Sequence, residues 1–94
     1  MEYTALNYVG FEDYLVEEST GSLFGGFCYE FAFPNEYGAS VVKHSISYGS
    51  NEDLFELAVL KNGNICYTTE ITDDVEGWLT NDEVIKYFVM IMNL

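Results

Sequence analysis

The dipeptide Asn62-Gly63 lies between two apolar runs and constrains the fold more than any other feature of the chain. A two-residue type I′ turn needs positive φ at both central positions, and asparagine and glycine adopt that conformation most readily. We therefore predict a β-hairpin that joins an apolar strand over 54–60 to a strand ending near Thr69. The turn also predicts three cross-strand pairs, namely Leu60 with Ile65, Val59 with Cys66 and Ala58 with Tyr67.

Two more strands are predicted upstream of this hairpin, because apolar residues recur there with a period of two. The first spans 23–33 and ends at Pro34, which has no N–H to donate. The second spans 39–48. Each strand should turn one row of side chains to the core: Leu23, Phe27, Tyr29, Phe31 and Phe33 in the first, and Val42, His44, Ile46 and Tyr48 in the second.

Thr80 and Glu83 have the spacing of a capping box, which marks the start of a helix. Helical periodicity then predicts an α-helix from Asn81 to about Met92. Its apolar face should consist of two rows, Val84, Phe88 and Ile91 in one and Ile85, Val89 and Met92 in the other. The remaining residues should face solvent: Asp82, Glu83, Lys86, Met90 and Asn93.

A weaker helical pattern in the first twenty residues rests on the spacing of Leu6, Val9, Tyr14 and Leu15. Together with the strands and the C-terminal helix, it predicts an α+β fold in a single domain over residues 1–94. The expected architecture is a four-stranded antiparallel meander. The C-terminal helix, and optionally a short N-terminal one, should pack on one face of that sheet.

The balance of charge limits the class of partner. The chain has 16 Asp and Glu against three Lys and no Arg, which gives a formal net charge of −13. Proteins that bind nucleic acid neutralise phosphates with patches of Lys and Arg, and anionic membranes attract the same residues. We therefore expect no direct contact with nucleic acid or membrane, and a basic protein as the partner.

The acidic residues fall chiefly in Glu12 to Glu18, Glu52 to Glu56 and Glu70 to Glu83. Two of these stretches are predicted to bind the partner, on one surface or on two: Glu70, Asp73, Asp74, Glu76, Asp82 and Glu83 in the first, and Glu12, Asp13, Glu17 and Glu18 in the second. The first stretch puts six carboxylates within 14 residues and contains no basic residue. Duplex DNA presents about one negative charge per 1.7 Å of its axis, so such a row predicts imitation of phosphates. The alternative is a solvated acidic segment that keeps the protein soluble.

Two aromatic residues lie close to these features. Tyr37 lies in the predicted hairpin loop Pro34-Asn35-Glu36-Tyr37-Gly38. It is predicted to be an exposed anchor for the partner at the tip of that loop, because tyrosine is favoured at protein interfaces. Trp78 is a second candidate anchor, but it comes just before the Thr80 cap. We expect it to pack under the helix in the manner of a hydrophobic staple.

Calcium is a rival interpretation of the acidic stretch from Glu70 to Glu83. If Gly77 is the sixth position of an EF-hand loop, Asp74, Glu76 and Glu83 fall at positions three, five and twelve. Thr72, however, stands at position one, where aspartate is needed. The match is therefore partial, and we expect no metal or other cofactor.

No catalytic residue is expected either. His44 lies between two apolar residues of a predicted strand, and the two cysteines, Cys28 and Cys66, have neither a CxxC spacing nor a neighbouring Lys or Arg that would activate a thiol. Carboxylates in an exposed turn ionise normally and supply no general acid. The sequence therefore predicts a protein that is not an enzyme.

Several segments invite comparison with known proteins: Phe31-Ala32-Phe33, Tyr37-Gly38-Ala39-Ser40-Val41-Val42, Ser47-Tyr48-Gly49, Leu54-Phe55-Glu56-Leu57-Ala58-Val59-Leu60 and Ile71-Thr72-Asp73-Asp74-Val75. Together they resemble a family of short, uncharacterised acidic proteins of phages, prophages and mobile elements of Gram-positive bacteria. The likeness covers roughly residues 27–94. The chain departs from the family pattern at Glu36, where Gly is more usual, and at Glu70, where Pro is expected.

The resemblance implies a biological context and no activity or site residue. Small acidic proteins of such elements are often inhibitors of host defence, including anti-CRISPR and anti-restriction proteins. The expected function is therefore a non-enzymatic inhibitor that binds a basic nucleic-acid-handling host protein by DNA or RNA mimicry. The alternative is an interaction or homo-oligomerising module, for example a dimer formed through an exposed sheet edge, whose acidity serves solubility.

The expected location is the cytoplasm, that of the host cell if a phage encodes the protein. The first ten residues do not resemble a signal peptide, since they contain Glu2 and no basic residue. The longest apolar stretch, 87–92, is too short to span a bilayer.

Overall fold

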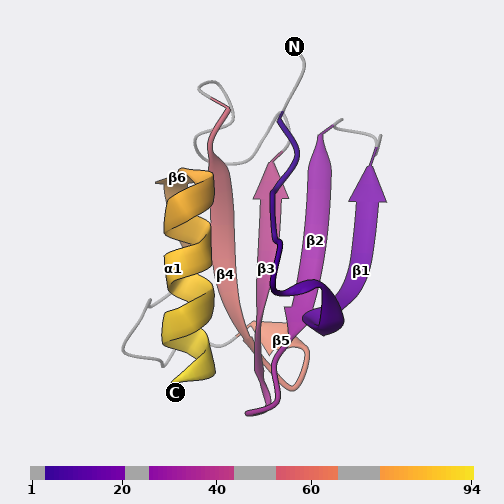
Figure 1. Cartoon of the computed structure of the whole chain (residues 1–94), viewed down its shortest axis with the longest axis vertical. Coiled ribbons are helices and arrows are strands. Elements are labelled where there is room, and N and C mark those ends of the chain that lie inside the picture. Colours follow the sequence, from indigo (N-terminus) through magenta and orange to yellow (C-terminus); the bar gives the residue numbers. More distant parts are fainter. Residues whose placement is uncertain (1–3, 21–25, 44–52, 66–74) are drawn as a thin grey trace.

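The computed structural model describes residues 4–20, 26–43, 53–65 and 75–94. They form one antiparallel sheet with the C-terminal helix and the N-terminal segment lying across the same face (Figure 1). The elements, in chain order, are a 3₁₀ helix η1 (Glu12–Tyr14) and then β1 (Leu15–Thr20), β2 (Phe27–Ala32), β3 (Tyr37–Lys43), β4 (Phe55–Lys61), β5 (Asn64–Ile65), β6 (Val75–Leu79) and α1 (Asn81–Met92). The α+β prediction is confirmed.

Six strands occupy five positions across the sheet. Strands β1, β2, β3 and β4 follow one another, and β5 and β6 both pair with the remaining edge of β4. The predicted count of four strands is wrong because β1 and β6 were not predicted. Within the described part of the predicted strand 23–33, Gly26 and Phe33 do not belong to β2. Residues 23–25 and the predicted continuation of β3 beyond Lys43 lie outside the described residues.

The hairpin between β4 and β5 has the predicted turn. Asn62 and Gly63 have φ values of 53° and 84°, and Leu60 pairs with Ile65. Further along the same edge, Ala58 pairs with Val75 of β6 and not with Tyr67, so the predicted register holds only next to the turn. The pair predicted for Val59 and the end of the strand near Thr69 lie outside the described residues.

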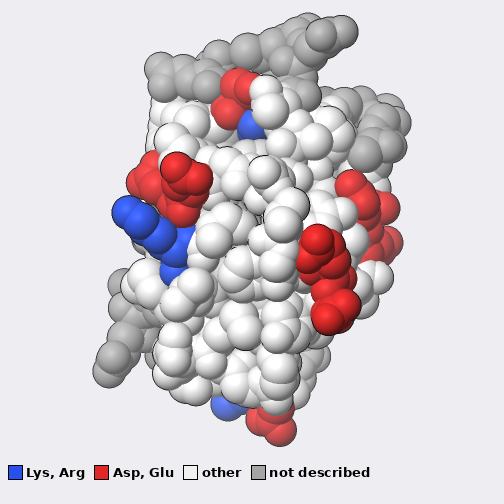
Figure 2. Space-filling model, in the orientation of Figure 1, with Lys and Arg blue, Asp and Glu red and all other residues white. Residues whose placement is uncertain are grey.

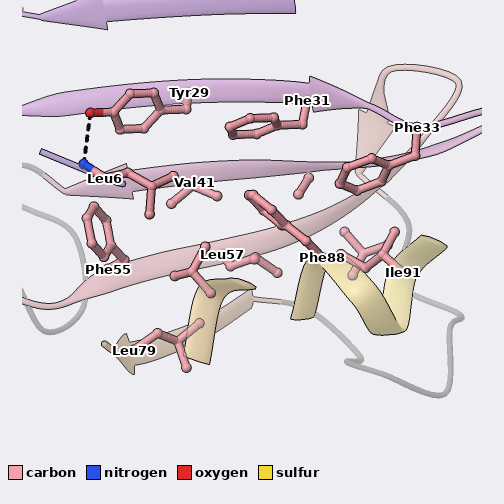
Figure 3. Packing of buried hydrophobic residues seen from close by; sticks show 13 residues of the cluster. Leu6, Tyr29, Phe31, Phe33, Val41, Phe55, Leu57, Leu79, Phe88 and Ile91 are labelled. Carbon is pink, nitrogen blue, oxygen red and sulfur yellow. Dashed lines mark hydrogen bonds between the residues drawn. The ribbon is translucent and has the colours of Figure 1, made fainter. Parts of the chain in front are cut away.

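The core is rich in aromatic side chains. Tyr29 and Phe31 of β2, and Phe33 just after it, are at most 5% exposed, which confirms the predicted core side of this strand. Phe88 of α1 points toward them, and its ring centroid lies 4.6 Å from that of Phe31 (Figure 3). Each fully buried side chain of this kind contributes about 1.5–3 kcal/mol of hydrophobic free energy. This cluster holds α1 against the sheet.

The core side of β3 differs from the prediction. Ala39, Val41 and Lys43 are buried, whereas Val42 is half-buried on the opposite face, where it pairs with Cys28 and Glu56. Directly paired residues of neighbouring strands share a face. The pairing with β2 therefore fixes the face of β3, and it places a lysine on the core side.

Helix α1 begins and ends where predicted. The Glu83 N–H donates to Thr80 Oγ1 at 3.3 Å and the Thr80 N–H donates to Glu83 Oε1 at 3.1 Å, which completes the capping box. Val84 and Phe88 are fully buried, as predicted. Val89 is 50% exposed, so the apolar face is narrower than the two predicted rows.

The predicted N-terminal helix is wrong, because residues 4–20 contain a short 3₁₀ helix and a strand but no α-helix. The segment before η1 is tied to the rest of the fold by its backbone. The Leu6 N–H donates to the Tyr29 hydroxyl at 3.1 Å (Figure 3). The Asn7 N–H donates to Asn81 Oδ1 at 2.7 Å, and Asn81 Nδ2 donates back to the Asn7 carbonyl at 2.9 Å.

Candidate partner-binding surface

The three lysines are distributed unequally between the interior and the surface. Lys43 is 1% exposed, and its Nζ lies 2.9 Å from Asp53 Oδ1, 2.9 Å from the Thr4 carbonyl oxygen and 3.7 Å from the centroid of the Phe55 ring. Lys61 and Lys86 are exposed. Lys43 and Asp53 thus offset each other's charge, which leaves Lys61 and Lys86 as the lysines on the surface.

The Asp53 carboxylate joins its own segment to Thr4 near the N-terminus and to Lys43 of β3. Its Oδ1 also accepts a hydrogen bond from the Thr4 N–H at 2.8 Å, and its Oδ2 accepts one from the Thr4 hydroxyl. Desolvation acts to raise the pKa of Asp53, but the hydrogen bonds from Thr4 and Lys43 outweigh it and hold the pKa below its usual range. This group was not predicted, although Lys43 shares a strand face with the apolar Val41, which is a sequence signal for a buried lysine.

The four N-terminal acids of the predicted site are all exposed. Glu12 and Asp13 lie in η1, and Glu17 and Glu18 lie in β1. Because side chains alternate along a strand, the last two point to opposite faces: Glu17 pairs with Glu30 and Glu18 pairs with Tyr29. These acids therefore surround the η1–β1 edge and do not form one row.

Two of these acids have partners within the chain. Glu12 Oε1 accepts a hydrogen bond from the Gly10 N–H at 2.6 Å, and Glu18 Oε2 accepts one from the Tyr8 hydroxyl at 3.4 Å. Desolvation raises the pKa of Tyr8, and the negative charge of Glu18 raises it further. The N-terminal carboxylates thus help to order the segment that crosses the sheet.

The C-terminal acids are described only in part. Glu70, Asp73 and Asp74 lie outside the described residues, and Glu76 is described only as a backbone position of β6. Asp82 and Glu83 are exposed in the first turn of α1. Backbone and hydroxyl hydrogen bonds from Thr80 lower the pKa of Glu83, which is therefore engaged in the cap.

Figure 2 shows how these charges are arranged on the face that carries α1 and the N-terminal segment. Acidic side chains lie in separate groups near its margins, beside η1 and β1 on one side and beside the first turn of α1 on the other. Uncharged side chains occupy the centre. Within the described part of this face, the acids thus flank an uncharged area and do not form a continuous stripe.

Trp78 is 56% exposed, so the prediction that it packs under α1 is wrong. Strand β6 has a bulge at this point, because Gly77 and Trp78 together lie opposite Glu56 alone. Trp78 adopts a φ of 62°, which is unusual for a bulky residue, while Leu79 takes the buried position. The bulge turns the indole outward, two residues before the helix cap.

Tyr37 is not the exposed loop residue that was predicted. It is the first residue of β3 and is half-buried, with the Lys61 Nζ 5.3 Å from its ring centroid. An ammonium at this distance over an aromatic face is a weak cation–π contact. Tyr37 therefore belongs to the edge of the core more than to an open anchor.

The structure also bears on the reactivity of the cysteine thiols and on the calcium interpretation of the acidic residues. Desolvation raises the pKa of the exposed Cys28 thiol, and the charges of Glu17 and Glu30 raise it further, so the reactive thiolate is disfavoured. His44 and Cys66 lie outside the described residues, as do Thr72 and Asp74 of the calcium interpretation.

Two further findings apply to the described ranges alone. Their His, Cys, Asp and Glu side chains form no group of three that could hold a metal ion. No helix found there has the length and apolar character needed to cross a membrane.

Comparison with protein-family models, with curated proteins and with solved structures found no match. The resemblance to the family of phage and mobile-element proteins stays a prediction.

Proposed function

We propose that this protein is a non-enzymatic binding protein whose partner is a basic protein. The observation that carries the proposal is the excess of exposed carboxylates over exposed lysines, since Lys43 is buried against Asp53 and the two charges offset each other. Only Lys61 and Lys86 are left to offset the exposed acids, which include Glu12, Asp13, Glu17, Glu18, Glu36, Asp82 and Glu83. Such a surface attracts a positively charged partner over a distance and repels phosphate-rich ligands.

Trp78 supplies the apolar part of the proposed contact. It is 56% exposed and stands four positions before Asp82 in the chain. Tryptophan is enriched among the residues that dominate binding energy at protein interfaces, and its ring also accepts cations on its face. An exposed indole in a segment that also carries exposed acids suits a partner that presents Arg or Lys.

The narrower proposal concerns the kind of partner. Proteins that grip DNA or RNA present Lys and Arg at the spacing of phosphates, so an acidic protein can compete for that groove. Together with the resemblance described above, this supports a cytoplasmic inhibitor of a nucleic-acid-handling host protein, of the anti-CRISPR or anti-restriction type. The separate groups of acids around an uncharged area favour contact at several points over imitation of one straight phosphate row.

A binding experiment tests the proposal. The immobilised protein is exposed to a lysate of a Gram-positive bacterium and eluted with rising salt, or with duplex DNA as competitor. We expect a basic partner that is released between about 50 and 200 mM salt and is displaced by the DNA. The triple variant Asp13→Asn, Glu17→Gln, Asp82→Asn should lose the partner, whereas the charge-retaining control Asp13→Glu, Glu17→Asp, Asp82→Glu should keep it. Equal capture by both variants would refute the proposal.

One observation favours the alternative of an assembly module. Val89, Met90 and Leu94 at the C-terminal end of the chain are 41–50% exposed, and contiguous apolar surface often marks an interface. The exposed Glu17 and Glu18 of β1, by contrast, oppose pairing of this edge with a second copy. Sedimentation analysis separates the two functions, because an apolar assembly persists at high salt and a charge-based complex does not.

A further inference from the structure

A pocket of about 200 Å³ lies where the turn between β2 and β3 meets the turn between β4 and β5. Glu36 of the first turn and Asn62 and Gly63 of the second line one end of it. The Asn62 N–H donates to the Glu36 carbonyl at 2.9 Å, so the two turns are held together. The position of this end of the pocket is therefore fixed by the backbone.

The floor of the pocket is a row of residues across three strands. Ala32 pairs with Gly38, and Gly38 pairs with Leu60, so all three share the sheet face opposite α1. A Cβ atom at Gly38 would collide with the carbonyl oxygen of Phe31, so this position excludes a side chain. The hollow arises because position 38 carries no side chain, and the close approach of the β2 and β3 backbones leaves no room for one.

The charged residues that line the pocket are both acidic. Glu30 comes from β2, two residues before Ala32, and Glu36 comes from the turn, where its φ of 73° is in the left-handed region. Glu17 of β1 pairs with Glu30 and adds a third carboxylate to the same face. None of the three lysines lines the pocket. Lys61 lies over the ring of Tyr37, which also lines the pocket, but the three carboxylates outnumber this one positive charge and favour a cation.

The size of the pocket decides what kind of cation fits. Pockets for cofactors and drug-sized ligands enclose about 300–1,000 Å³, so 200 Å³ suits one side chain and not a whole small molecule. Arginine combines an apolar stem, which can lie along Ala32 and Leu60, with a planar head that forms paired hydrogen bonds to carboxylates. We propose that this pocket receives an arginine side chain of the partner.

This inference rests on the proposed function, since it assigns a contact to the basic partner. It is tested without that partner, by titrating the purified protein with a tetra-arginine peptide at low salt and measuring the dissociation constant by calorimetry. The Glu30→Gln, Glu36→Gln variant should weaken binding about tenfold, because two charge-assisted hydrogen bonds are lost. The comparison variant Glu12→Gln, Asp13→Asn removes the same charge from the η1 part of the proposed partner-binding surface. It reports the loss of affinity that net charge alone causes, which should be smaller than the loss in the pocket variant.

A second variant separates the shape of the pocket from its charge. Ala32→Leu fills the floor and leaves the net charge unchanged, and it should also weaken binding about tenfold. Amide resonances of Gly38, Asn62 and Gly63 should shift on addition of the peptide to the wild type. The inference would be overturned if Ala32→Leu bound the peptide as tightly as the wild type. It would also be overturned if the charge variants at the pocket and at η1 lost the same amount of affinity for the peptide. If Ala32→Leu fails to fold, the comparison of the two charge variants and the resonance shifts decide alone.

The outcomes for the pocket and for the proposed function are distinguishable. In one outcome, the lysate experiment captures a basic partner in a salt-sensitive way, but the peptide binds the pocket variants as tightly as the wild type. That outcome overturns the inference about the pocket and leaves the proposed function in place. Failure to capture a partner overturns the proposed function, whatever the peptide does.

Discussion

The Nζ of Lys43 lies 2.9 Å from Oδ1 of Asp53, although Lys43 is 1% exposed and Asp53 keeps 34% of its side-chain surface in water. Removal of the carboxylate would leave a buried ammonium with one carbonyl partner. We expect Asp53→Asn to lower the free energy of unfolding by about 2 kcal/mol, less than for a fully buried pair because water reaches the aspartate. Urea denaturation measures this loss. The double variant Lys43→Met, Asp53→Asn should recover most of it, and a single variant as stable as the wild type would contradict the prediction.

The same pair predicts how stability depends on pH. The pKa of Asp53 is lower in the folded than in the unfolded chain, where it is about 4, so its contribution is present above that value and is lost as pH falls through the folded pKa. We expect the difference in Tm between the wild type and Asp53→Asn to be constant from pH 7 to 5 and to shrink below about pH 4. Comparison with the variant cancels the repulsion among the other acids. A difference that does not change down to pH 2 would argue against the ion pair.

Gly38 should be intolerant of any side chain. The Cβ of an alanine would meet the Phe31 carbonyl oxygen, which belongs to the backbone of β2 and cannot rotate away. We expect Gly38→Ala to destabilise the protein by about 3 kcal/mol. Gly10→Ala is the control: Gly10 has a φ of 97° but open space around it, so only backbone strain of about 1 kcal/mol applies. Thermal melts of the two variants should rank in that order.

Trp78 should contribute to binding and not to stability. Its φ of 62° is unfavourable for tryptophan, so Trp78→Gly relieves strain and should leave the free energy of unfolding unchanged or raise it by about 1 kcal/mol. Leu79→Ala, at the neighbouring buried position, should cost about 2–5 kcal/mol. Acrylamide should quench the fluorescence of this single tryptophan almost as strongly as that of the free amino acid. Strong protection from quenching in the unbound protein would contradict its exposure.

Local signals predicted the elements that depend on local chemistry. The turn at Asn62 and Gly63 and the cap at Thr80 and Glu83 each require particular residues at fixed spacing, and both were found as predicted. Strand β1 was missed because consecutive glutamates obscure the alternation of an edge strand. Strand β6 was missed because its bulge interrupts the period of two.

Features that depend on distant partners could not be predicted in this way. From the sequence alone, Lys43 would be expected to face solvent. It is buried because Asp53, ten positions later in the chain, lies beside it and pairs with its charge. The exposure of Trp78 depends on the pairing of β6 with β4, which no short segment specifies. The exposure of Asp82 and Glu83, by contrast, followed from the helical period alone.

Strand β4 holds both ends of the segment 66–74. Leu60 pairs with Ile65 and Ala58 pairs with Val75, so the two anchoring positions are two residues apart on one strand, or about 7 Å. Strand β4 alone thus sets the register of both β5 and β6, so a substitution that shifts the pairing of β4 moves the hairpin turn and the strand before α1 together.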